Sequence, residues 1–370
     1  MIKPIAFYLP QFHPIPENDE WWGKGFTEWT NVSKAKPLFL NHQQPFLPSE
    51  LGYYDLRVSE TREQQATLAR EHGLYGFAYW HYWFGNGKLL LERPAEEVLA
   101  SGKPDFPFCF AWANETWSGR WHGLADKILI EQQYPGLEDR KQHFNYCLRF
   151  FNDPRYIKVN EKPVFIIYRP ELVPDELDMV NLWNLWAQEA GLDGIHFIGV
   201  SDNDACLAKG FAGRIQNAPL ISHELKSKRK LFLDDTGMLY RLMVKLGLKQ
   251  KVRYPEVYGY EDYVDSRISS NISPNEYPLV LPGWDNTPRS SHRGLVLQNT
   301  SPEAFKKYIE FACHSFSKTE LEGNFLFIKS WNEWAEGNVM EPSVLFGRRY
   351  LDALQEVVGK YNHSVKKHEN

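Results

Sequence analysis

The sequence has few cysteines, no long apolar run and no strong net charge. Its four cysteines, Cys109, Cys147, Cys206 and Cys313, lie far apart and include no C-x-x-C pair. This spacing disfavours a disulfide framework or a zinc site and favours reduced thiols in the core of a cytoplasmic protein. No stretch approaches the roughly 18 apolar residues of a membrane-spanning helix. The net charge of −5 gives no reason to expect nucleic acid or an anionic membrane as the main partner.

Signals for targeting, cofactors and metals are also missing. The apolar run before Pro10 is too short for the core of a signal peptide and suits a first strand. There is no G-x-G-x-x-G after a strand, no Walker lysine loop, no G-x-S-x-G elbow and no H-E-x-x-H. We therefore expect neither a cofactor nor a metal. One weak exception is Asp202-Asn203-Asp204, which resembles the D-x-D pattern that holds a divalent metal in many nucleotide-sugar glycosyltransferases.

Aromatic residues, in contrast, are abundant. They make up 15% of the chain, with 13 Trp, 19 Tyr and 23 Phe. Many of them must be buried in the core, because aromatic side chains bury a large apolar surface. The excess of Trp and Tyr also fits a protein that stacks rings against sugars and binds their hydroxyl groups.

Eight short apolar runs alternate with segments of helical character. Each run is nearly continuous in apolar residues, as expected of parallel strands that are buried on both faces. Helices are predicted over 59–70, 137–151 and 175–190, and another begins at Ser301-Pro302-Glu303. The alternation predicts an α/β fold, a (β/α)8 barrel, with a doubly wound open sheet as the alternative. The predicted strands are 4–9, 74–79, 106–112, 163–168, 195–200, 213–216, 277–281 and 325–330.

We predict one domain over 1–360, followed by a polar tail over 361–370. A long loop over 10–57 and an insertion over 221–270 interrupt the alternation. The insertion carries a basic cluster, which we interpret as a solvated face, with contact to phosphate or an acidic glycan as the alternative. The cluster consists of Lys226, Lys228, Arg229 and Lys230. The sequence does not indicate an oligomeric state.

Chemistry in such a barrel lies at the C-terminal ends of the strands. Nearly every predicted end is followed by an aromatic ring, a histidine, an amide or a charged side chain, which together predict a glycan-binding surface. Glu115 and Asp285 are also possible catalytic carboxylates. The predicted substrate-binding residues are Tyr8, Gln11, His13, Tyr79, His81, Trp83, Trp112, Asn114, Glu115, Tyr168, Trp284, Asp285, Arg289, Trp331, Asn332 and Trp334.

The last predicted strand leads into two glutamates, Glu333 and Glu336, flanked by tryptophans. Residues three apart in a turn can place their side chains on one side, roughly 5–6 Å apart at Cβ. Such proximity drives the two pKa values apart and leaves one carboxyl protonated. Cleavage of a glycosidic bond uses such a pair. We therefore predict that Glu333 and Glu336 are catalytic. The alternative is a solvated pair on an exposed turn, which the neighbouring Trp331 and Trp334 disfavour.

Several motifs together resemble the WbsX family over about residues 3–355. WbsX proteins are linked to bacterial lipopolysaccharide and O-antigen biosynthesis and are often labelled glycosyltransferases. The resemblance adds Trp29 to the expected binding residues. The motifs are Tyr8-Leu-Pro-Gln-Phe-His-Pro14, Trp22-Gly-Lys-Gly-Phe-Thr-Glu-Trp29, Phe77-Ala-Tyr-Trp-His-Tyr-Trp-Phe84, Trp112-Ala-Asn-Glu115, Gly283-Trp-Asp-Asn-Thr-Pro-Arg289 and Trp331-Asn-Glu-Trp-Ala-Glu-Gly337.

WbsX proteins in turn resemble glycoside hydrolase family 99, whose members are (β/α)8 enzymes acting within α-mannans. In that family an N-E-W-x-E-G segment carries the catalytic pair. By this resemblance, Glu333 is the base that deprotonates the 2-hydroxyl and forms a 1,2-anhydro sugar, and Glu336 is the general acid and then the base for water. The anomeric configuration is retained. Ala335 departs from the family, which has histidine at this position.

Three hypotheses for the function follow. The leading one is an enzyme that cleaves or transfers glycosyl units of bacterial surface polysaccharide or related oligosaccharides. The second is a nucleotide-sugar glycosyltransferase that binds its donor near Asp202 and Asp204. The third is a glycan-binding barrel without catalytic activity. In each case the expected partner is an oligosaccharide or polysaccharide.

Overall fold

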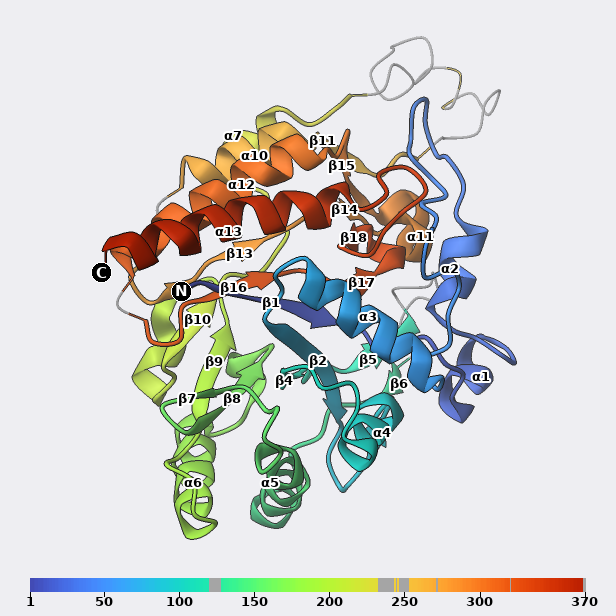
Figure 1. Cartoon of the computed structure of the whole chain (residues 1–370). Coiled ribbons are helices and arrows are strands. Elements are labelled where there is room, and N and C mark those ends of the chain that lie inside the picture. The colour runs from blue at the N-terminus through green and yellow to red at the C-terminus, as the bar shows by residue number, and fades with distance from the viewer. Residues whose placement is uncertain are drawn as a thin grey trace.

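The computed structural model describes residues 1–119, 128–231, 253–270, 272–319 and 321–368, together with residues 243 and 245. Its centre is a sheet of parallel strands, each paired with the next (Figure 1). In spatial order these are β12 (Glu276–Tyr277), β10 (Gly213–Ile215), β9 (His196–Val200), β8 (Lys162–Ile167), β4 (Phe108–Trp112), β2 (Gly76–Trp83), β1 (Lys3–Tyr8), β16 (Phe325–Ile328) and β13 (Leu279–Val280).

The sheet closes into a barrel because β12 and β13 are two pieces of one strand. Pro278 separates them, and proline has no N–H to donate to a neighbouring strand. The first piece pairs with β10 and the second with β16. All eight predicted strands are therefore confirmed, and the barrel is observed rather than the open sheet.

Helices cover the outside of the barrel (Figure 1). The predicted helices are confirmed, and the Ser301 hydroxyl caps α12 by accepting the Ala304 N–H. Residues 361–368 continue the last helix. None of the described helices combines the length and the apolar character needed to cross a bilayer. The outer helices are α3 (Ser59–Glu71), α4 (Arg93–Ser101), α5 (Leu137–Phe151), α6 (Glu176–Glu189), α10 (Tyr260–Ile268), α12 (Pro302–Ser315) and α13 (Arg349–His368).

The remaining elements are short and lie mainly in the loops. The small strands are β3 (Leu89–Leu90), β5 (Trp117–Ser118), β6 (Ile128–Ile130), β7 (Lys158–Val159), β11 (Glu256–Gly259), β14 (Trp284–Asp285), β15 (Leu295–Gln298), β17 (Asn332–Glu333) and β18 (Asn338–Val339). The short helices are α1 (Pro16–Trp22), α2 (Glu28–Lys34), α7 (His223–Ser227), α11 (Thr287–Ser290), η2 (Pro170–Leu172), η3 (Asp204–Lys209), η4 (Ser291–Arg293), η5 (Phe316–Lys318) and η6 (Trp334–Glu336).

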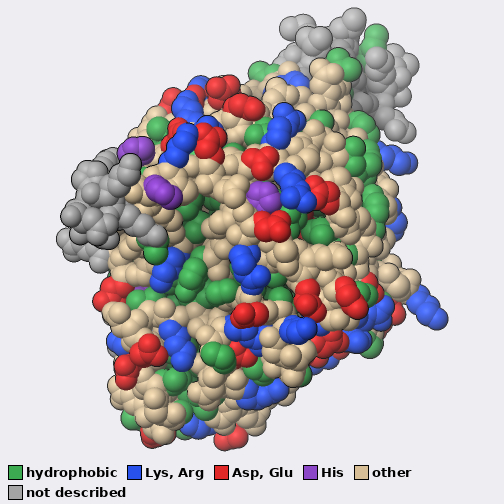
Figure 2. All heavy atoms as spheres, in the orientation of Figure 1, with side chains coloured by type: hydrophobic (Ala, Val, Ile, Leu, Met, Phe, Trp, Pro, Cys, Tyr) green, Lys and Arg blue, Asp and Glu red, His purple; other side chains and the backbone are tan. Residues whose placement is uncertain are grey.

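The two predicted interruptions have their own structure. The long loop over 10–57 contains α1 and α2. The described part of the insertion contains α7 and β11, and β11 joins β15 and β14 in a separate three-stranded sheet. Most of residues 232–252 lie outside the described residues. In the basic cluster, Lys228 pairs with Asp262 at 2.9 Å and Lys230 donates to Gln298. Charges of both signs are interspersed over the face in Figure 2.

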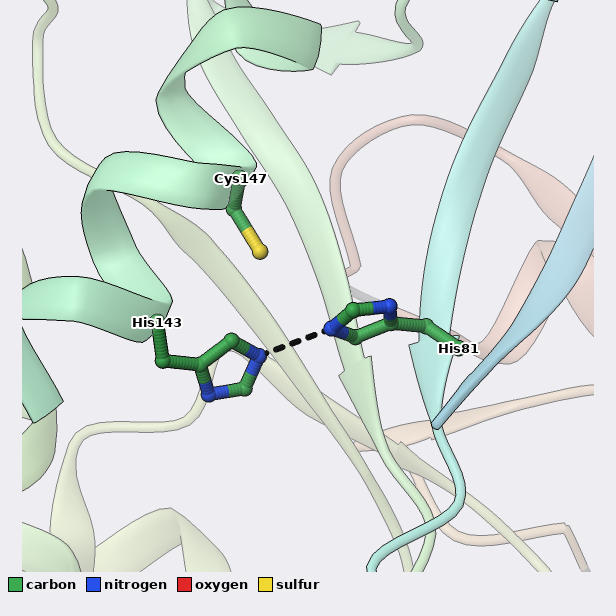
Figure 3. A group of neighbouring side chains, drawn as sticks. All are labelled: His81, His143 and Cys147. Carbon is green, nitrogen blue, oxygen red and sulfur yellow. Dashed lines mark hydrogen bonds between the residues drawn. The ribbon is translucent and has the colours of Figure 1, made fainter. Parts of the chain in front are cut away.

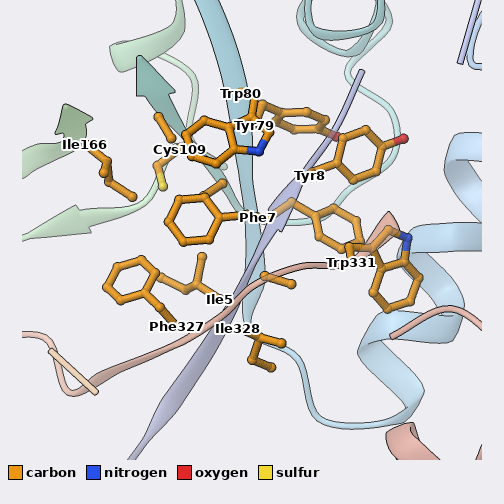
Figure 4. Packing of buried hydrophobic residues seen from close by; sticks show 14 of the residues in the cluster. Ile5, Phe7, Tyr8, Tyr79, Trp80, Cys109, Ile166, Phe327, Ile328 and Trp331 are labelled. Atoms are coloured by element: carbon orange, nitrogen blue, oxygen red, sulfur yellow. The ribbon is translucent and has the colours of Figure 1, made fainter. Parts of the chain in front are cut away.

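Side chains of both faces of the strands are buried. Phe7 stacks on Trp80 inside the barrel with ring centroids 4.8 Å apart, and Phe327 lies beside Phe7 (Figure 4). On the outer face, Trp183 of α6 is fully buried against Phe165 of β8. When both faces of a strand are buried, the sequence has no polar face that would show which side chains point into the barrel.

We expect the interior ring of Phe327 to be essential for stability. Phe327→Ala should lower the free energy of unfolding by about 3–5 kcal/mol, because it leaves a cavity among rings that cannot close in. Urea unfolding followed by tryptophan fluorescence measures the change. Leu185→Ala, at a half-exposed position on α6, is the control and should change it by less than about 0.5 kcal/mol. Equal effects of the two variants would contradict the assigned packing.

Candidate active site

A cavity of about 400 Å³ opens at the C-terminal ends of the barrel strands. Its walls combine aromatic rings with charged groups, which suits a ligand that has flat apolar faces and many hydroxyls. Both predicted catalytic glutamates line it. The polar and aromatic lining residues include Gln11, Trp22, Glu28, Trp80, Tyr82, Glu115, Trp117, Tyr168, Asn217, Trp284, Asn286, Arg289, Lys329, Glu333 and Glu336.

The two glutamates lie on a tight hairpin that follows β16. Glu333 is in β17 and Glu336 is in η6, and β17 pairs with β18. Gly337 turns the chain back with φ of +65°, and a Cβ there would lie 2.9 Å from the backbone nitrogen of Asp285. Only glycine therefore fits the turn that brings the two carboxyls into one cavity.

The Glu333 carboxyl is buried and favours its protonated form. Burial, with the nearby Glu336 carboxylate as the next cause, raises the pKa of Glu333 to about 8. The indole N–H of Trp80 donates to its Oε1 at 2.8 Å. A hydrogen bond also joins the two carboxyl groups.

The pKa of Glu336 is shifted in the opposite direction. Burial, the largest single cause, would raise the pKa of its carboxyl, but Arg289, the hydrogen bond with Glu333 and the charge of Lys329 together hold the pKa below its usual range. The Arg289 Nη1 lies 2.6 Å from the Glu336 Oε1. The pair therefore holds one proton near neutral pH, and this proton lies on Glu333.

Arg289 also joins the long loop to the catalytic hairpin. Its Nη2 lies 2.7 Å from Oε1 of Glu28, which is buried on α2. Burial raises the pKa of Glu28 despite this contact. One guanidinium is therefore shared by two buried carboxyl groups from distant parts of the chain. The sequence contained Glu28 within an aromatic motif, but nothing in it identified the partner.

The structure brings seven of the predicted site residues to the cavity. Five of them are predicted binding residues, which contribute a ring, an amide or a charged group to the wall. One of these five, Glu115, pairs with Arg169 at 2.8 Å. The seven are Gln11, Glu115, Tyr168, Trp284, Arg289, Glu333 and Glu336.

Strand β2 presents the opposite face from the one predicted. Trp80 and Tyr82 line the cavity, whereas Tyr79, His81 and Trp83 do not. Successive side chains of a strand point to opposite sides, so a one-residue offset exchanges all of them. The sequence reasoning missed Trp80 and Tyr82 because both faces of β2 are buried and aromatic.

His81 packs in the core against α5 (Figure 3). Its Nε2 lies 2.9 Å from Nε2 of His143, with Cys147 close by. Burial lowers the pKa of both imidazoles and raises that of the Cys147 thiol. Among the described residues this is the one group whose ligand-type atoms are near enough to hold a metal ion. In this structure the two imidazoles are hydrogen-bonded to each other beside the Cys147 thiol.

The other predicted residues lie behind the cavity wall. Tyr8 donates to Gln65 at 2.7 Å, and Asn332 pairs with both backbone polar groups of Leu9. Trp331 is fully buried, and Trp334 donates to the buried Glu341 at 2.7 Å. These contacts hold the hairpin against the first strand and α3.

The rim of the barrel is braced in the same way. The Trp29 indole donates to the Tyr54 carbonyl, and the Trp112 indole donates to the Trp83 carbonyl. Asn114 exchanges hydrogen bonds with the backbone of Arg169. Asp285 accepts from His42, Gln44 and Thr287, and His13 is buried outside the cavity. These side chains support the site without lining it.

The D-x-D segment does not form a cluster of free carboxylates. Asp204 pairs with Arg214 at 2.5 Å, and Asp202 accepts the backbone N–H of Asn217. Arg214 also pairs with the buried Glu276. These contacts engage both carboxylates within the protein.

Solved structures with the same fold include glycoside hydrolases. A family GH99 endo-α-mannosidase from Bacteroides thetaiotaomicron, in complex with bis-tris-propane, superposes with a TM-score of 0.58 at 15% identity, covering 99% of this chain and 98% of that one. A glycoside hydrolase-like protein gives a TM-score of 0.57 at 14% identity, over 96% and 93% of the two chains. At this level of identity the similarity concerns the fold.

Sequence comparison identifies longer relatives. Protein WxcX of Xanthomonas campestris pv. campestris, itself uncharacterized, is 37% identical over 360 residues in strain ATCC 33913 and 36% identical in strain B100. These matches cover 96% of this chain and 49% of each relative, so the chain spans about half the length of the curated relatives it matches.

The match to a family model extends over nearly the whole chain. The model described as "Glycosyltransferase WbsX" matches residues 4–354, which include the barrel, the long loop and the glutamate hairpin. The chain therefore belongs to the WbsX glycosyltransferase family.

Proposed function

We propose that this protein is a carbohydrate-active enzyme that cleaves or transfers glycosyl units, with Glu333 and Glu336 as its catalytic pair. The observation that carries the proposal is the pair of buried carboxyl groups that line one aromatic cavity, with their pKa values shifted in opposite directions. Breaking a glycosidic bond needs one group that gives a proton and one that takes a proton or attacks. The pair contains both at neutral pH.

The surrounding residues fit a sugar. Trp80, Trp117 and Trp284 contribute aromatic rings to the cavity wall, and Gln11 and Asn217 contribute amides. The family and the solved hydrolases with this fold support a glycan as the substrate. We propose bacterial surface polysaccharide, or an oligosaccharide related to it, as the substrate class.

The roles of the two glutamates require the proton to move. As base for the 2-hydroxyl, Glu333 must be ionised, and as general acid Glu336 must be protonated. In the free site the proton favours Glu333. We propose that a sugar hydroxyl donating to Glu333 stabilises its anion, and that the proton then passes along the hydrogen bond to Glu336. No proton enters or leaves the pair in this step.

Substitution of either glutamate tests the proposal. Glu333→Gln and Glu336→Gln should each lower kcat on a cleavable oligosaccharide by about 10²–10⁴-fold, because each removes one partner of the proton transfer. A screen of defined oligosaccharides, with product anomers followed by NMR, finds the substrate and should show retention. On an aryl glycoside with a good leaving group, Glu336→Gln should lose much less activity than Glu333→Gln.

The exposed Glu171 on the cavity side of the barrel provides the control. Glu171→Gln makes the same chemical change and should leave kcat unchanged. Full activity of Glu333→Gln or Glu336→Gln would contradict the assignment of the two glutamates as the catalytic pair.

The pH dependence of kcat/KM should have two limbs. At high pH the rate should fall as Glu333 loses its proton, near pH 8, because both carboxyls are then ionised. At low pH the rate should fall only at pH values below the ordinary pKa of glutamate, because the pKa of Glu336 is lowered. Protonation of Glu336 there leaves both carboxyls protonated. A rate that keeps rising well above pH 8 would contradict the single-proton arrangement.

Arg289 should set the position of the acid limb. Arg289→Met removes the charge that lowers the pKa of Glu336, so the acid limb should move up by about 1–3 pH units. Arg289→Lys keeps a cation at the site and should move it much less. An unchanged acid limb in a folded Arg289→Met protein would show that Arg289 does not control Glu336.

A further inference from the structure

Lys329 presents a buried ammonium group to the cavity. It lies at the end of β16, two residues after Phe327, and its side chain has the inward orientation of that strand position. The residue is only 8% exposed, yet it lines the cavity. Its Nζ donates to the Ala218 carbonyl at 3.1 Å. An ammonium group has three donors, and this is its one hydrogen bond within the described residues.

Aromatic rings and the charges of the glutamate pair surround Lys329. Burial lowers the pKa of its ammonium group, but Tyr168, Glu333 and Glu336 raise it. Its Nζ lies 5.1 Å from the centroid of the Trp284 ring and 5.9 Å from that of Tyr168. Ring faces stabilise a cation but do not replace a hydrogen-bonded anion. No carboxylate of the described residues lies within 4 Å of this ammonium group. It is therefore desolvated, charged and able to donate further hydrogen bonds into the cavity.

Arg289, the other cation among the described residues that line the cavity, already has close partners in Glu28 and Glu336. Arg169, which pairs with the cavity residue Glu115, is also directly paired. Lys329 thus differs from both arginines, whose guanidinium groups are directly paired. Glu333 and Glu336 act on the Lys329 ammonium group through space only, so an anionic ligand bonded to it would add the direct counter-charge that it lacks.

We propose that the cavity binds a sugar that carries an oxyanion substituent, a carboxylate or a phosphate, and that Lys329 donates to this group. The inference rests on the proposed function, since it names the class of glycan that the glutamate pair acts on. The oxyanion would contact the Nζ beside Trp284, while the sugar ring lies toward Glu333. The hydrogen bond to the Ala218 carbonyl fixes the position of the ammonium group. Its remaining N–H donors therefore favour an anionic substituent at one position of the sugar ring.

Glucose, glucuronic acid and glucose phosphate test the inference as probes of one ring with three substituents. Their affinities for the full chain can be measured by saturation-transfer NMR and isothermal titration. Wild-type protein should bind glucuronic acid or glucose phosphate at least about tenfold more tightly than glucose, as expected for a charge-assisted hydrogen bond in a buried site. The two acidic probes distinguish a carboxylate from a phosphate as the preferred group.

Three variants test whether Lys329 causes the preference for an acidic sugar. Lys329→Met has a similar length without charge and should abolish the preference for the acidic sugar, so that the affinities for the three sugars become similar. Lys329→Arg should keep the preference. Lys226→Met, in the exposed basic cluster, is the matched control and should behave as wild type.

Four results would overturn the inference. Equal affinity of the wild-type protein for all three sugars would exclude the oxyanion site while leaving the proposed glycan cavity intact. A preference that survives in Lys329→Met, or that disappears in Lys226→Met, would move the anion elsewhere. If none of the sugars binds and no oligosaccharide is turned over, the proposed function itself fails, and the inference fails with it.

Discussion

The site depends on one buried guanidinium that is shared by two carboxyls. Arg289 contacts Glu28 from the long loop and Glu336 from the hairpin after β16, so residues far apart in sequence are held in one cavity. Charges in a buried site interact strongly, and losing one partner leaves the others unpaired. The same contact keeps Glu336 ionised, which in turn favours the proton on Glu333. The contacts of Arg289 therefore both hold the two segments together and favour the ionised form of Glu336.

The barrel gives this chemistry a rigid setting. The hairpin that carries the glutamates is held by Asn332 on the backbone of Leu9 and by Trp334 on the buried Glu341. Glu341 accepts further hydrogen bonds from Tyr54 and Gln65, which belong to the long loop and to α3. The residues around the pair thus act on its position rather than on a ligand. Small displacements of such a hairpin would change the hydrogen bond on which proton exchange depends.

The sequence predicted the barrel well because its strands and helices alternate with clear signals. The glutamate pair was equally visible, since two carboxylates between tryptophans follow a strand. The orientation of β2 was not visible, because Tyr79 and Trp80 are both aromatic and both buried. Glu28 and Lys329 were missed for a different reason: their roles come from partners and neighbours that only the folded chain brings together.

The most direct test of the account is a titration of the two side-chain carboxyls by carbon-13 NMR, with signals assigned through Glu333→Gln and Glu336→Gln. In the free protein we expect one signal to titrate near pH 8 and the other below the ordinary range for glutamate, with the first belonging to Glu333. With a bound glycan, the proton should lie on Glu336. Two carboxyls that both titrate in the ordinary range, and that do not respond to glycan, would show that Glu333 and Glu336 do not share one proton.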